Sequence, residues 1–215
     1  MLFPTIVIDN FFDDTDSIIK YSNTLDYKAP EDGSYPGTRS PNLDKTFFQF
    51  STKKMMAALY PMNYRFMTWA GSQFFQKING QDYPYEGWVH QDFTTEITAI
   101  VYLSKENNCG TAINTPLSHD REIIYVDEKH EQFKEVYNKK GEDKDQKKYL
   151  DKNNSRFKKT INVDSVFNRL ILFDSSNYHS VINFGKTERL TLITFIGEIR
   201  SEQAIKYPLS EMRRS

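Results

Sequence analysis

One segment, ITAIVYL at residues 97–103, constrains the fold of this chain more than any other. Its odd-numbered positions are Ile, Ala, Val and Leu, and its even-numbered positions are Thr, Ile and Tyr. Because successive side chains of a strand point to opposite faces, this pattern predicts a β-strand with an apolar face in a hydrophobic core. Other parts of the chain must therefore supply the strands that complete a sheet around this one.

Segments of similar character occur on both sides of it. We expect further strands at TIVIDNFF, TAIN, RLILF, NYHSVI and ERLTLITFI, with Gly185 in the turn between the last two. Helices are expected after the first strand, through about Leu25, and at STKKMMAALY, whereas residues 64–78 fit either a helix or a strand. This order predicts a mainly β fold with flanking helices (α+β), a jelly roll or cupin-like barrel, in a single domain over residues 1–215.

Residues 118–160 have a different composition, with Lys and Arg interspersed among Asp and Glu. The pattern predicts a charged insertion that leaves the sheet, with a helix near Glu128 to Lys139 and a mobile segment after it. Mixed charge of this kind is typical of a solvated face. The formal net charge of −1 adds no overall attraction to nucleic acid or to an anionic membrane.

Three further features of the sequence bear on the cellular compartment of the protein. Cys109 is the one cysteine of the chain, so an intrachain disulfide is impossible. The N-terminal residues lack the basic and apolar regions of a signal peptide, and no apolar run reaches the length that crosses a bilayer. We therefore expect a cytoplasmic protein that is not inserted in a membrane.

His90 and Asp92 stand one residue apart just before the alternating segment. If this stretch is extended, both side chains lie on one face, and a buried carboxylate is costly unless it is paired or binds a metal. His179, on another expected strand, is the best candidate for a third ligand. Two histidines and one carboxylate are the ligand set of non-haem Fe(II) oxygenases, which leave positions open for substrate and O2. The ligand types alone leave Fe, Mn, Co and Ni open.

Arg189 follows His179 by ten residues, at the head of a strand whose neighbours are apolar. A guanidinium binds a carboxylate through two parallel hydrogen bonds, so Arg189 is a candidate anchor for a 2-oxoacid with a second carboxylate. Thr191 on the same strand face and Tyr102 on the alternating strand are candidate hydrogen-bond donors. In ordinary packing, Arg189 would instead lie at the surface, Tyr102 would be a packed aromatic and Thr191 a common strand residue.

Together these motifs resemble a known family. HQD at residues 90–92, the distant His179 and Arg189 resemble the HxD…H…R pattern of the 2-oxoglutarate/Fe(II)-dependent dioxygenases. AIVYLSKE followed by CGTAI resembles the prolyl-hydroxylase-like members, in which a tyrosine placed like Tyr102 contacts 2-oxoglutarate. FNRLILFDSSNYHSV, GTAI and YPGTRS are similar to a little-characterised bacterial and phage-associated branch. The resemblance covers most of the chain but not residues 118–160.

The resemblance implies a double-stranded β-helix fold and the cofactors Fe(II), 2-oxoglutarate and O2. It implies a metal site at His90, Asp92 and His179, and oxidative decarboxylation of 2-oxoglutarate to succinate and CO2. An aspartate at position 92 favours hydroxylation, because related halogenases have a small residue there. The branch that repairs alkylated nucleic acids has a second arginine six residues after the first, and Phe195 occupies that position here.

We therefore predict a 2-oxoglutarate/Fe(II)-dependent dioxygenase that acts on a small molecule or a protein side chain, and we do not expect nucleic acid as a partner. Arg189, Tyr102 and Thr191 are the predicted 2-oxoglutarate contacts. Residues 26–46 and the charged insertion are expected to shape substrate entry, and Arg39 faces either the substrate or solvent. The alternative is a non-catalytic jelly-roll module that binds or senses a metal or ligand.

Overall fold

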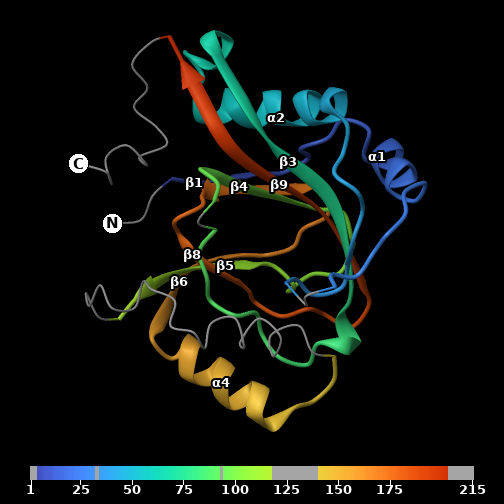
Figure 1. Cartoon of the computed structure of the whole chain (residues 1–215), viewed down its shortest axis with the longest axis vertical. Helices are drawn as coiled ribbons and strands as arrows, with labels where there is room; N and C mark the ends of the chain where they lie inside the picture. Colours follow the sequence, from blue (N-terminus) through green and yellow to red (C-terminus); the bar gives the residue numbers. More distant parts are fainter. Residues whose placement is uncertain (1–3, 32–33, 93, 118–139, 203–215) are drawn as a thin grey trace.

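The computed structural model describes residues 4–31, 34–92, 94–117 and 140–202. Two antiparallel sheets lie face to face, with helices α1 and α2 on the outer side of the larger sheet and α4 beyond the smaller one (Figure 1). The larger sheet has the strand order β1 (Thr5–Ile8), β7 (Arg169–Asp174), β4 (Ile97–Tyr102), β9 (Glu188–Ser201), β3 (Met67–Asn79) and β2 (Thr38–Arg39). The smaller sheet has the order β6 (Phe157–Val163), β5 (Thr111–Pro116) and β8 (Tyr178–Val181).

This arrangement is a jelly roll with flanking helices, as the strand pattern predicts. The described strands form two separate sheets and do not close into a continuous barrel. Residues 64–78, which the sequence leaves ambiguous, form a short 3-10 helix (Tyr64–Phe66) followed by β3, and a second 3-10 helix (Gly80–Asp82) follows that strand. None of the described helices is both long enough and apolar enough to cross a membrane.

The helices begin where acidic side chains cap them. α1 (Thr15–Ser22) follows Asp14, whose carboxylate accepts a hydrogen bond from the Ser17 N–H at 3.0 Å. α2 (Lys45–Leu59) follows Asp44, whose carboxylate accepts hydrogen bonds from two N–H groups of the first turn. Such caps satisfy N–H groups that have no partner within the helix.

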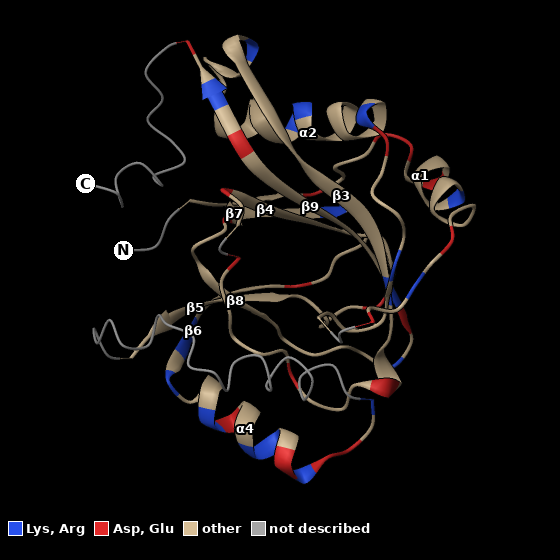
Figure 2. Ribbon diagram, viewed as in Figure 1, with Lys and Arg blue, Asp and Glu red and all other residues tan. Residues whose placement is uncertain are grey.

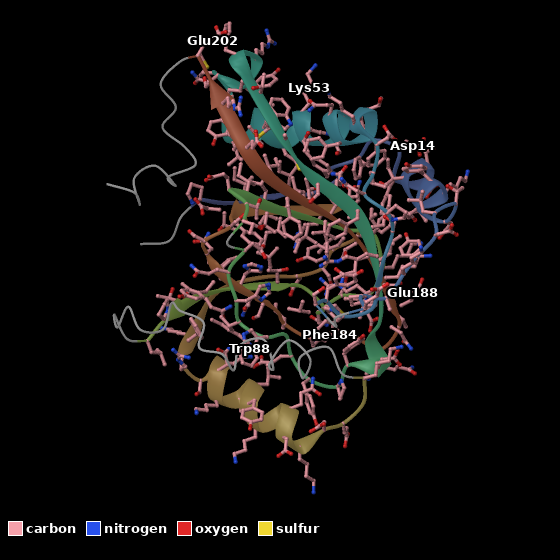
Figure 3. All side chains as sticks on the ribbon, viewed as in Figure 1. Asp14, Lys53, Trp88, Phe184, Glu188 and Glu202 are labelled. Carbon is pink, nitrogen blue, oxygen red and sulfur yellow. The ribbon has the colours of Figure 1, made fainter. Side chains whose placement is uncertain are left out.

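The alternation of residues 97–103 is confirmed, and the strand has two different buried faces. Ile97, Ala99 and Val101 lie in the core between the larger sheet and the helices. Tyr102 belongs to a second cluster that includes Ile113 of the smaller sheet, so this face of β4 lies between the two sheets. Figure 3 shows side chains of both sheets meeting in that space. Polar side chains are also buried on this face of β4, among them Thr98.

The late part of the charged insertion contains regular structure that the sequence did not predict. Residues 144–154 form α4 (Lys144–Asn154), and β6 pairs with β5 in the smaller sheet. Residues of both charge signs occur along α4 (Figure 2), but two of its own residues, Gln146 and Leu150, are buried. Val163 of β6 packs between the sheets. A few apolar contacts thus hold a segment whose composition is dominated by charge. The helix expected near Glu128 to Lys139 falls outside the described residues.

Candidate metal centre

His90 and His179 meet across an antiparallel bridge between the chain before β4 and strand β8. The His90 N–H donates to the His179 carbonyl at 3.0 Å, and the His179 N–H donates to the His90 carbonyl at 2.8 Å. Side chains at such directly opposed positions lie on the same face, and the two imidazole centroids are 4.3 Å apart. Residues 90 and 179, far apart in the sequence, are therefore neighbours in the fold.

Asp92 completes the group from a loop, because the described residues between His90 and Ile97 do not form a strand. The expectation that His90 and Asp92 share a strand face is wrong in this detail. The Asp92 N–H donates to the Ser175 carbonyl at 3.0 Å, which turns the chain toward β8. The carboxylate lies 3.4 Å from His179 Nε2 through Oδ2 and 3.9 Å from His90 Nε2 through Oδ1.

The three ligand atoms lie within 4.8 Å of one another. Bonds of about 2.1 Å to one ion place its ligand atoms roughly 3 to 4 Å apart, so this spacing is close to that of a metal site. The side chain of His90 is 35% exposed, against 17% for Asp92 and 7% for His179. The group is therefore accessible from the His90 side and enclosed on the His179 side.

Backbone carbonyls fix the protonation of both imidazoles. His90 Nδ1 lies 2.8 Å from the Trp88 carbonyl, and His179 Nδ1 lies 3.0 Å from the Asn177 carbonyl. A carbonyl oxygen only accepts hydrogen bonds, so each Nδ1 carries a proton, and in the neutral ring Nε2 is the nitrogen with the lone pair. Both lone pairs are thus available beside Asp92. Orientation of ligand imidazoles by a second hydrogen bond is usual at metal sites, and these residues fit a divalent metal ion.

Burial keeps His179 neutral. It lowers the pKa of His179 to about 4, with repulsion from His90 as the second cause, and the Asp92 carboxylate acts in the opposite direction. His179 is therefore uncharged at neutral pH. A neutral imidazole is the form that ligates a metal ion.

Thr98 supports the carboxylate, and sequence reasoning did not identify it as a site residue. Its hydroxyl donates to Asp92 Oδ2 at 2.6 Å and lies 2.9 Å from the Ser175 hydroxyl. Thr98 is buried on the face of β4 that looks toward the smaller sheet, the face that also carries Tyr102. The alternating pattern of residues 97–103 places Thr98 and Tyr102 on one face of the strand. This pattern was the sequence signal from which Thr98 could have been identified as a site residue.

Arg189 lies on the same inter-sheet face, near the start of β9. It is only 5% exposed, and its guanidinium carbon is 5.6 Å from the Tyr102 ring centroid. The reading of Arg189 as a surface arginine is therefore wrong. Thr191 is buried directly opposite Tyr102 in the pairing of β9 with β4. The structure thus brings together the three residues predicted to contact a 2-oxoacid.

The Tyr102 hydroxyl is positioned by a neighbour from the smaller sheet. It lies 2.7 Å from the Thr111 hydroxyl, and both residues are buried. Burial raises the pKa of the Tyr102 phenol, while the charge of Arg189 acts in the opposite direction. Since the net shift is upward, the phenol stays protonated at neutral pH and is able to donate a hydrogen bond.

The other candidates have mixed outcomes. Arg39, on β2, is half-buried with its guanidinium 3.8 Å from the Tyr35 ring centroid and 4.3 Å from that of Phe74. Cys109 is buried, and burial raises the pKa of its thiol, which fits a packing role. His119 and His130 of the charged insertion, whose composition predicts solvated side chains and not metal ligands, lie outside the described residues.

A family model described as "Family of unknown function (DUF6445)" matches residues 3–188, so the chain belongs to this family. The match includes both histidines and the aspartate of the cluster and ends one residue before Arg189. No curated protein matches the sequence.

Several solved structures have a similar fold. HygX from Streptomyces hygroscopicus, with nickel, 2-oxoglutarate and hygromycin B bound, superposes with a TM-score of 0.57 at 14% identity, covering 91% of this chain and 83% of that one. A Pseudomonas putida prolyl-4-hydroxylase gives 0.54 at 10% identity, covering 91% and 93%. The non-heme alpha ketoglutarate dependent epimerase SnoN, from nogalamycin biosynthesis, gives 0.50 at 12%, covering 90% and 77%.

At these identities the likeness concerns the fold. The chain has the jelly roll found in 2-oxoglutarate/Fe(II) oxygenases, and those neighbours include a hydroxylase and an epimerase. The resemblance to a bacterial and phage-associated branch stays a prediction.

Proposed function

We propose that this member of the DUF6445 family is an Fe(II)- and 2-oxoglutarate-dependent dioxygenase that hydroxylates a small molecule or a protein side chain. The observation that carries the proposal is the cluster of two Nε2 lone pairs and one carboxylate at His90, Asp92 and His179. The cluster lies in a jelly roll of the kind seen in oxygenases that bind iron or nickel and 2-oxoglutarate.

Each residue of the cluster has a defined part. His179 supplies a neutral, buried ligand, and His90 supplies the ligand on the accessible side. Asp92 contributes negative charge. The hydrogen bond from the Thr98 hydroxyl fixes the orientation of its carboxylate. Bound Fe(II) would supply the redox chemistry that couples decarboxylation of 2-oxoglutarate to oxidation of the substrate.

The buried group around Arg189 fits the far end of the cosubstrate. A guanidinium among apolar and aromatic side chains interacts with a carboxylate more strongly than one in water, and two parallel hydrogen bonds fix its orientation. The protonated Tyr102 hydroxyl and the Thr191 hydroxyl are suited to donate further hydrogen bonds. The accessible His90 side is then the direction from which a substrate approaches.

An anaerobic titration of the apo-protein with Fe(II) and 2-oxoglutarate tests the cofactor assignment. A 2-oxoacid chelated to Fe(II) gives a weak visible charge-transfer band. We expect the band in the wild type and its loss in His90→Ala and Arg189→Ala. A folded wild-type protein that binds Fe(II) without the band would contradict the proposal.

Turnover separates an enzyme from a binding module. In air with Fe(II), we expect slow succinate formation from 2-oxoglutarate even without substrate, and faster formation when a substrate is added. Binding of both cofactors with no succinate above the His179→Ala background would favour the non-catalytic module. Incorporation of one oxygen atom from ¹⁸O2 into the product distinguishes hydroxylation from other outcomes on this fold.

A further inference from the structure

The segment that carries His90 forms the outer edge of the smaller sheet. On one side it pairs with β8: the Gly87 N–H donates to the Val181 carbonyl at 2.8 Å, and His90 exchanges two hydrogen bonds with His179. Val89 precedes His90 directly, and successive residues of an extended segment direct their N–H and C=O groups to opposite sides. The N–H and C=O of Val89 therefore point away from β8, where the described chain has no further strand.

The last two residues of α4 occupy that side. Asn154 Oδ1 accepts a hydrogen bond from the Val89 N–H at 3.0 Å, and Asn153 Nδ2 donates to the Val89 carbonyl at 3.1 Å. Asn154 Nδ2 also donates to the Gly87 carbonyl at 3.0 Å and to Glu86 Oε1 at 2.9 Å. A carboxamide has the same donor and acceptor groups as a peptide bond, so two side chains replace a neighbouring strand.

The contact joins two parts of the chain that are distant in sequence. α4 belongs to the charged insertion, lies beyond the smaller sheet (Figure 1) and buries the side chains of Gln146 and Leu150. Figure 3 marks Trp88, between Gly87 and Val89, where the segment passes above α4. The same Trp88 carbonyl accepts a hydrogen bond from His90 Nδ1–H. The end of α4 therefore fixes the backbone that orients His90.

We propose that α4 is a positioning element of the metal site, in which Asn153 and Asn154 hold the backbone of Val89 so that His90 Nε2 faces Asp92 and His179. This inference rests on the proposed metal site. Since the influence between two linked equilibria is reciprocal, metal binding stabilises the docked position of α4 to the same extent that docking strengthens metal binding.

The first test measures metal affinity directly. Co(II) is titrated into the apo-protein of the wild type, the double variant Asn153→Ala/Asn154→Ala and the control Lys148→Ala, which alters an exposed side chain of the same helix. We expect about tenfold weaker Co(II) binding in the double variant and wild-type affinity in the control, a loss typical for removal of groups that orient a ligand. A folded double variant with wild-type affinity would overturn the inference.

A second measurement excludes a general loss of stability. Hydrogen exchange of residues 144–154 is followed with and without saturating Co(II) in the intact protein. We expect Co(II) to slow exchange there in the wild type and in Lys148→Ala, but not in His90→Ala. No change in the wild type would refute the linkage even if the double variant does not fold.

The two proposals fail differently. Absence of any Co(II) binding by the folded wild type would refute the metal site itself, and the inference with it. Wild-type binding without protection of α4 refutes only the role of the helix.

Discussion

At the scale of single residues, the proposed metal site depends on which nitrogen of each histidine carries a proton. The carbonyls of Trp88 and Asn177 hold the Nδ1 protons, so the geometry selects Nε2 as the ligand atom in both rings. Two backbone carbonyls thus decide which ring nitrogen of each imidazole is available to bind a metal ion.

His179→Ala is expected to abolish Co(II) or Fe(II) binding and 2-oxoglutarate turnover, because two ligands do not hold a divalent ion tightly. The metal content of the purified variant and its succinate formation measure these losses. Circular dichroism shows whether the fold persists. Undiminished turnover in a folded, clean preparation would refute the ligand assignment.

Arg189→Lys is expected to weaken 2-oxoglutarate binding by about tenfold to a hundredfold, because an ammonium lacks the two parallel donors of a guanidinium. The matched control is Arg169→Lys on β7, whose guanidinium bonds the half-exposed Asp9 carboxylate. Titration of each metal-loaded protein with 2-oxoglutarate gives the comparison. Equal dissociation constants in Arg189→Lys and the wild type would show that Arg189 is not the anchor.

Thr98→Val removes the hydrogen bond to Asp92 while keeping the shape of the side chain. We expect metal affinity to fall about tenfold to a hundredfold. Thr194→Val is the control: this buried threonine bonds Gln73 on the helix side of β9, away from the metal cluster. It should lower the melting temperature without changing the metal dissociation constant, and a similar loss of affinity in both variants would argue against a specific role for Thr98.

At the scale of elements, the pairing of residues 87–90 with β8 depends on the absence of a side chain at Gly87. A Cβ atom there would lie 2.6 Å from the Val181 backbone nitrogen, closer than atoms approach without displacement. The segment must therefore shift if any side chain is added, and the shift moves His90.

Gly87→Ala is accordingly expected to cost about 1 to 3 kcal/mol of folding stability and to weaken metal binding. Gly197→Ala is the control, because its nearest contact would be an ordinary 3.5 Å. Thermal unfolding and Co(II) titration of both variants provide the measurement. If Gly87→Ala bound Co(II) like Gly197→Ala, the backbone position of this segment would not control the site.

Elements differed in how well the sequence predicted them. β4, β7 and β9 have clear apolar patterns and occur where they were expected. α4 and β6 were missed, because their stability comes from a few buried side chains such as Leu150 and Val163 within a highly charged segment. Local composition reports solvent exposure, and it does not report contacts made by single residues in the tertiary structure.

At the scale of the whole molecule, the proposed metal site and the Arg189 group lie on one face between the two sheets. A ligand that binds only the folded state stabilises it by about 2.7 kcal/mol at a concentration one hundred times its dissociation constant. For a chain of this length, that corresponds to a rise of roughly 5 to 10 °C in melting temperature.

Co(II) with 2-oxoglutarate is therefore expected to raise the melting temperature of the wild type by this amount. His179→Ala should show no such rise, and Arg189→Lys should respond to Co(II) but less to 2-oxoglutarate. Differential scanning fluorimetry under anaerobic conditions measures all three. An equal shift in His179→Ala would place the binding of these ligands elsewhere.

The sequence by itself determined which side chains are available as metal ligands and hydrogen-bond donors. It also determined the alternating strand pattern that leads to a sheet fold. Alternation along β4, β7 and β9 follows from burial of apolar side chains, a local property that can be read from neighbours in the chain. Only the tertiary structure decided that Asp92 reaches the histidines from a loop, that Thr98 bonds it, and that Asn153 and Asn154 hold the segment of His90. These contacts join residues 6 to 65 positions apart through single hydrogen bonds, whose partners no periodic pattern specifies.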